Sequence, residues 1–175
     1  MTDQTFIAIA AQYADDESAA ADFARISAHF KETEKREAFD AALINRGLDG
    51  KLSVLKREDG GKRHGTRKGL SIGLATGLAV ALFPAVAVGG ALVVAGGSGA
   101  GLGAIAQHIG RKTPSKDLAF ISETLEAGSG GIVLVLEPED VSGVESLLTG
   151  AVKVTKKDLS VNDEELDEEV DKAYE

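Results

Sequence analysis

The stretch "GIVLVLE" (131–137) decides the fold that we expect for this chain. Its apolar residues follow one another without alternation, which is typical of a strand buried on both faces of a sheet. A glycine-rich turn signal precedes the run, and Pro138 follows it as a helix-start signal. We therefore expect residues 131–137 to form a central strand.

The N-terminal region carries a strand signal followed by a helix signal. "TFIAIAAQY" (5–13) is a short apolar run, and Asp15 and Asp16 after it can cap a helix. Within that helix, Phe23, Ile26 and Phe30 lie on one face and predict its buried stripe.

Four further segments complete the expected order. Residues 38–46 and 51–58 flank "GLDG" and predict a β-hairpin. A helix is predicted from Ser115 up to Gly128, and a second, shorter one begins at Pro138. Residues 151–159 then predict an edge strand that is protected by lysines.

This order predicts an α+β fold with one core, as befits a chain of 175 residues. Residues 1–60 and 113–160 read as a discontinuous ferredoxin-like βαββαβ sandwich, in which both helices cover one face of an antiparallel sheet. Residues 61–112 are expected to be an inserted glycine-rich helical hairpin. Residues 161–175 form an acidic tail, which is either disordered or a helix that docks through Leu166, Val170 and Tyr174.

The inserted segment carries no charged residue between Lys68 and His108. Small residues spaced four apart lie on one helix face and let two backbones approach closely. Pro84 is the expected hairpin turn. The glycines expected to pack helix against helix are Gly69, Gly73, Gly77, Gly89, Gly97 and Gly101.

Basic residues flank this apolar segment on both sides, and they predict that both ends lie on the cytoplasmic side of a membrane. They are expected to contact anionic headgroups. The residues concerned are Lys62, Arg63, Arg67, Lys68, Arg111 and Lys112. A helix over residues 69–83 is about 22 Å long, shorter than a hydrocarbon core of roughly 30 Å. The hairpin therefore spans the membrane, dips into it, or packs its glycine faces in a homo-oligomer.

A nucleotide site is a competing interpretation of "ALVVAGGSGAGLGAIAQ" (91–107). Gly97, Gly101 and Gly103 imitate the turn of a dinucleotide-binding βα unit. The context argues against it, because too little chain follows for a doubly wound domain and no acidic residue ends a second strand. We expect no cofactor.

No other pattern predicts chemistry. The three histidines, His29, His64 and His108, lack partners at ligand spacing, so we expect positional roles for them and neither catalytic nor metal-binding residues. Ser98 lacks the flanking glycine of a nucleophile elbow, and cysteine is absent. A net charge of −9 disfavours nucleic acid as a partner. No small-molecule substrate is indicated.

The apolar segment "GTRKGLSIGLATGLAVALFPAVAVGGALVVAGGSGAGLGAIAQHIG" (65–110), "DLAFISETLEAGSGGIVLVLE" (117–137) and "VESLL" (144–148) together resemble a bacterial family of predicted membrane proteins, domain of unknown function 1269. The resemblance covers residues 5–155. It implies a small α/β domain with a glycine-rich hairpin and assigns no catalytic residue.

We therefore expect a non-enzymatic, self-associating structural protein at the cytoplasmic face of the inner membrane, with a role in scaffolding or envelope stress. The alternative hypothesis is a cytoplasmic homo-oligomeric assembly subunit or binding module whose hairpins pack on each other. A nucleotide-binding enzyme is the third hypothesis.

Overall fold

The computed structural model describes residues 4–32, 39–48, 52–59, 74–82, 85–88, 91–94 and 100–174. The strands are β1 (Gln4–Tyr13), β2 (Phe39–Arg46), β3 (Leu52–Asp59), β4 (Ala85–Val88), β5 (Ala91–Val94), β6 (Ser129–Leu136) and β7 (Lys153–Val161). The helices are α1 (Asp16–Glu32), α2 (Leu74–Leu82), α3 (Ala100–Lys112), α4 (Ser115–Thr124), the 3₁₀ helix η2 (Pro138–Asp140), α5 (Val141–Glu145) and α6 (Asp163–Tyr174).

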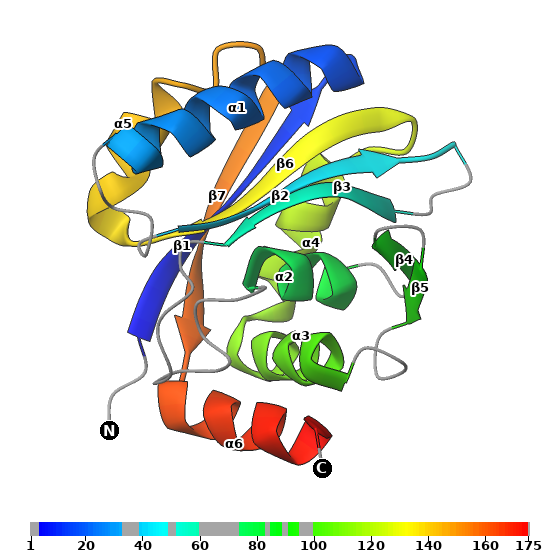
Figure 1. Ribbon diagram of the computed structural model, residues 1–175, viewed down its shortest axis with the longest axis vertical. Helices are drawn as coiled ribbons and strands as arrows, with labels where there is room; N and C mark the ends of the chain where they lie inside the picture. The colour runs from blue at the N-terminus through cyan, green and yellow to red at the C-terminus, as the bar shows by residue number, and fades with distance from the viewer. Residues whose placement is uncertain are drawn as a thin grey trace.

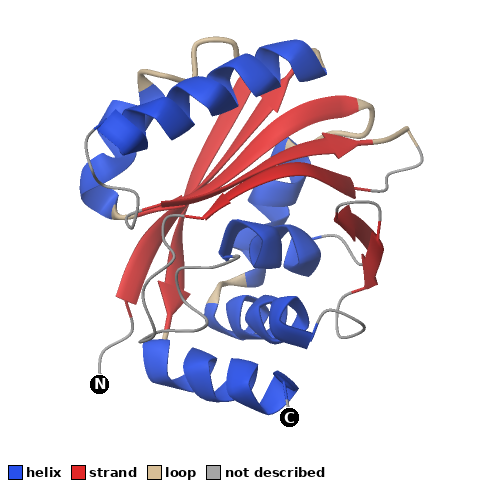
Figure 2. Ribbon diagram, viewed as in Figure 1, coloured by secondary structure: helices blue, strands red, loops and turns tan. Residues whose placement is uncertain are grey.

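The fold is α+β, as predicted, with one seven-stranded sheet in the order β5-β4-β3-β2-β6-β1-β7. Five neighbouring strands of this sheet, β3, β2, β6, β1 and β7, pair antiparallel. Helices cover both faces of the sheet (Figures 1 and 2).

Strand β6 lies inside the sheet, as the middle one of the five antiparallel strands, which confirms the prediction from "GIVLVLE". It pairs with β1 on one side, where Ile9 faces Leu134, and with β2 on the other, where Leu43 faces Ile132. Every residue from Gly130 to Leu136 is buried. The β2–β3 hairpin and the lysine-bearing edge strand β7 also form as predicted.

The two faces of the sheet bear separate layers of the core. One face packs Ile132 and Leu134 against Phe23 and Phe30 of α1 and Val144 of α5. Asp15 caps α1, since the Ser18 amide donates to its carboxylate at 2.7 Å. The stripe predicted for the first helix is therefore confirmed.

The other face of the sheet carries a stack of helices. Val133 and Val135 pack in the core cluster that contains residues of α2, α3, α4 and α6. Figure 1 shows α2 beneath the sheet, α3 beneath α2 and α6 beneath α3.

The structure differs from the predicted assignment of elements at two points. Helix α4, expected beside α1, buries Ile121 on the opposite face, and α5 takes the place beside α1. Strand β3, expected inside the four-stranded unit, lies outside β2, while β6 separates β1 from β2. The physical reason is burial: β6 is apolar on both faces and takes the centre, whereas β3 exposes Leu55 and Lys56 and tolerates an outer position.

The apolar segment also differs from a simple helical hairpin. Helix α2 leads through a crossover into β4, which runs parallel to β3, and β4 and β5 form a β-hairpin before α3. The predicted turn residue Pro84 lies outside the described residues. Among the described helices, none has the length and apolarity needed to cross a membrane.

Helix α2 owes its charge-free sequence to its position between the sheet and α3. Ala75, Leu78 and Ala79 are buried, as expected for a helix that is apolar all round. Its N-terminus is held by buried Asp40 of β2, whose carboxylate accepts from the Ala75 amide at 3.0 Å. A carboxylate there also interacts favourably with the helix dipole.

Gly77 brings α2 and α3 into close contact. A Cβ atom added at Gly77 would overlap Cγ2 of Ile105 and lie 3.0 Å from its Cβ, and a β-branched side chain cannot readily move aside. This contact lies within one chain, so the glycine serves packing of the protein's own core.

We predict that Gly77→Ala lowers the free energy of unfolding by about 1–3 kcal/mol, because it overpacks this contact. Urea unfolding followed by circular dichroism measures the change. Gly110→Ala in α3 is the matched control: a Cβ there meets no atom within 4 Å, so it is expected to be neutral or stabilising by up to about 1 kcal/mol. Equal effects of the two substitutions would contradict the close contact.

Candidate functional site

The acidic tail is an ordered helix that docks on α3. Asn162 caps α6, because its side-chain oxygen accepts from the Glu165 amide at 3.1 Å. Leu166 is fully buried in the core cluster shared with Ile105 and Ile109 of α3. Of the two states left open by the sequence, the structure therefore has the helix, docked through Leu166; the side chains of Val170 and Tyr174 lie outside the described ones.

His108 of α3 holds this helix at two points. Its side chain is fully buried. The Asn162 amide donates to Nε2 at 3.1 Å, and Nδ1 lies 3.2 Å from Oε2 of Glu169. A neutral imidazole with its proton on Nδ1 satisfies both contacts, since Nε2 then accepts and Nδ1 donates. These two contacts give His108 a place at the interface between α3 and α6.

The charges around His108 act against each other. Burial lowers the pKa of His108 from its ordinary value, while the neighbouring Glu169 and Glu165 raise it and Arg111 lowers it. Burial is the largest of these effects, so the neutral form is favoured in the folded protein. Protonation of Nε2 would also set two donors against each other at the Asn162 amide.

Arg111 and Lys112, for which the sequence predicts contact with headgroups, pair in the structure with carboxylates of the chain itself. Arg111 forms an ion pair with Glu169, and the Lys112 ammonium lies 3.2 Å from Oε2 of Glu165. We call His108, Arg111 and Lys112 the basic end of α3, and Glu165 and Glu169 the inner face of α6.

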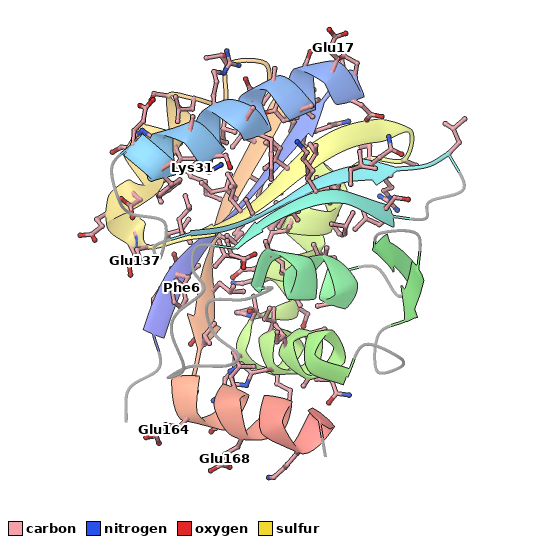
Figure 3. All side chains as sticks on the ribbon, in the orientation of Figure 1. Phe6, Glu17, Lys31, Glu137, Glu164 and Glu168 are labelled. Carbon is pink, nitrogen blue, oxygen red and sulfur yellow. The ribbon has the colours of Figure 1, made fainter. Side chains whose placement is uncertain are left out.

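The other side of α6 is exposed. Glu164 and Glu168 point away from the rest of the molecule (Figure 3). The helix therefore has an inner acidic face with partners and an outer acidic face towards solvent.

The structure brings together only part of the predicted site. Gly77 contacts α3, and Gly101 lies within α3. The remaining predicted site residues lie outside the described residues: Gly69, Gly73, Pro84, Gly89, Gly97, Lys62, Arg63, Arg67 and Lys68.

Sequence reasoning missed the pairing of the basic end of α3 with the inner face of α6. A signal was present in the spacing, since His108, Arg111 and Lys112 fall at i, i+3 and i+4 and lie on one helix face. Glu165 and Glu169 are likewise four apart and flank the expected docking residue Leu166. Each pattern was visible, but neither identifies its partner.

A second buried polar cluster surrounds Asp22 of α1. Its carboxylate accepts from the Tyr13 hydroxyl at 2.8 Å and the Gly150 amide at 2.9 Å, and it pairs with Arg25. Burial raises the pKa of Tyr13 to about 12. Both oxygens of Asp22 have partners, so this cluster anchors α1 to the chain around Gly150.

Among the described residues, Glu137, Glu139 and Asp140 form an acidic group whose oxygens lie within 4.8 Å of one another. Carboxylates suit hard cations such as Ca²⁺, but Glu137 and Asp140 each take part in further interactions within the chain. A neighbouring cavity of about 490 Å³ is lined in part by Lys156 and Lys157. Lys156 pairs with Glu145, and Lys157 lies 3.8 Å from Asp117, so these polar groups are also engaged.

We predict that protonation of His108 weakens the docking of α6. Its folded-state pKa is lowered, so the unfolded chain binds the extra proton first as the pH falls. The stabilisation is complete above the ordinary pKa of about 6.5 and is lost as the pH falls from there towards the folded-state pKa. The loss is at most about 1.4 kcal/mol per pH unit.

Urea unfolding of the wild type and His108→Gln at pH 7.5, 6.5 and 5.5 measures this contribution. Glutamine keeps a donor and an acceptor but does not titrate. The free energy of unfolding of His108→Gln is therefore expected to fall less steeply than that of the wild type as the pH falls. Parallel pH profiles would contradict the role of His108.

Comparisons of the chain with protein-family models, with curated proteins and with solved structures each found no match. The resemblance to family 1269 stays a prediction.

Proposed function

We propose that this protein binds anionic membrane surfaces without catalysing a reaction, at the cytoplasmic face of the inner membrane. The observation that carries the proposal is the basic end of α3, where Arg111, Lys112 and the Nδ1–H of His108 all meet carboxylates. Donors arranged in this way suit phosphate oxygens as well as carboxylates. The basic residues 62–68, which precede the apolar segment, would add to the same attraction.

The packing of the apolar segment supports binding of the protein to the membrane surface rather than insertion of a hairpin into the bilayer. Leu78 and Ile109, from the two helices of this segment, are fully buried within the chain. Gly77 meets Ile105 of the same chain. Apolar side chains that are already buried gain nothing further from lipid.

We also propose that the sheet contains a ferredoxin-like unit, made of β1, α1, β2, β6, α5 and β7. The strand order β7-β1-β6-β2 supports it, because β6 separates β1 from β2 and β1 separates β6 from β7. Helices α1 and α5 lie on the same face. The insertion is then the chain from β3 to α4, longer than the predicted hairpin.

Self-association is a second candidate function, and β7 supports it. This strand forms one edge of the sheet that the described residues make, and sheet edges are common places for two chains to pair. Val152 and Val154 are 64% and 42% exposed at its start. Two copies would extend one sheet across this edge.

Binding to vesicles of phosphatidylglycerol and phosphatidylcholine, measured by co-sedimentation, tests the first function. We predict that replacing Lys62, Arg63, Arg67 and Lys68 together by glutamine weakens binding at least about 10-fold, because each cation near an anionic surface contributes about 1 kcal/mol.

The matched control replaces four exposed lysines elsewhere, Lys31, Lys56, Lys116 and Lys153, by glutamine. It makes the same change in net charge and is expected to weaken binding much less. Equal losses, or no binding of the wild type to anionic vesicles, would overturn the proposal.

Light scattering at several protein concentrations tests self-association. We predict that Val152→Lys with Val154→Lys lowers the measured mass to that of one chain, because like charges would face each other across the paired edges. Leu55→Lys, at a site 52% exposed on β3, which pairs with β2 and β4 and so forms no edge of the sheet, is the control and should leave the mass unchanged. A wild-type protein with the mass of one chain at all concentrations would rule this function out.

A further inference from the structure

Helix α6 occupies the basic end of α3 in the way that an anionic ligand would. Glu169 pairs with the Arg111 guanidinium and accepts from the His108 Nδ1–H, and Glu165 pairs with the Lys112 ammonium. Two carboxylates of α6 thus bind three donors that lie on one face of α3.

We propose that the basic end of α3 is a binding surface for the phosphate groups of anionic lipid headgroups, and that α6 is a built-in competitor which covers it. This inference rests on the proposed function. It adds the ligand group that the basic end of α3 takes and the element that controls access to it.

The contacts of α6 are weak enough for such competition. Arg111 and Glu165 are 57% and 48% exposed, and their partners Glu169 and Lys112 are 28% and 25% exposed. Ion pairs this close to solvent contribute about 1 kcal/mol each. Among the α6 side chains that the structure describes, Leu166 is the fully buried one. A single residue, Asn162, joins α6 to β7. An element held by few buried contacts opens locally at low cost in free energy.

An extended anionic surface suits this exchange better than a single anion. The surface attracts Arg111 and Lys112 and repels the outer carboxylates of α6, Glu164 and Glu168, through the same field. These interactions act over a Debye length of about 8 Å at physiological salt. Attraction of α3 and repulsion of α6 therefore both favour the uncovered state at the membrane.

The test compares two full-length variants that differ only in which face of α6 loses charge. Glu165→Gln with Glu169→Gln alters the inner face, and Glu164→Gln with Glu168→Gln alters the outer face by the same net charge (Figure 3). Binding to the vesicles described above is measured at 0.15 M salt. The inner pair is expected to bind at least about 5-fold more tightly than the outer pair.

A further pair of substitutions identifies the surface that is uncovered. Adding Arg111→Gln and Lys112→Gln to the inner pair is expected to abolish its gain in binding. Inorganic phosphate at 10 mM should compete poorly, because it lacks the repeated charges of a bilayer; full competition would assign the site to a free phosphate and overturn the lipid proposal.

Hydrogen exchange on the wild type provides a readout that does not depend on folding of the variants. Amides of α6 should lose protection when anionic vesicles are added, while those of β6 keep theirs. Unchanged protection of α6 in the vesicle-bound protein would refute the proposal that α6 covers the basic end of α3. Equal binding of the inner and outer pairs would refute it as well. If neither variant nor the wild type binds vesicles, the proposed function itself fails.

Discussion

Strand β6 sets the constraint on which the rest of the structure depends, because its side chains are apolar on both faces. Two neighbouring strands satisfy its backbone, and a layer of helices must cover each face. Full burial of a large aliphatic side chain contributes about 1.5–3 kcal/mol, so leaving either face open would cost much of the stability of a domain this size. Helices α1 and α5 meet this need on one side, and the glycine-rich segment meets it on the other.

The helices that cover the second face become more polar with distance from the sheet, from α2 through α3 to α6. Helix α2 lies directly on the sheet and carries no charge, so it needs cover itself. Helix α3 supplies that cover and carries its cations at its C-terminal end, where they face the acidic helix α6. The charge-free sequence of α2 therefore matches its depth in the protein core.

Buried polar groups do different work on the two sides of the sheet. Asp22 has partners on both carboxylate oxygens and is enclosed, so it fixes α1 in one place. His108 is equally buried but bonds to a helix whose ion pairs with Arg111 and Lys112 each have one exposed member. The first arrangement stabilises the fold, and the second leaves an outer element that, in our proposal, ligands or pH displace.

The sequence by itself determined the central strand, the β2–β3 hairpin, the edge strand and the stripe of α1, because periodicity and turn residues are local signals. It did not determine which face of the sheet α4 or α5 would cover, since a buried stripe shows that a helix packs but not where. Nor could it distinguish lipid from protein around α2, because both are apolar surroundings for the same side chains. Only the tertiary structure brought His108 to Glu169, 61 positions away, since that contact depends on how α3 and α6 stack.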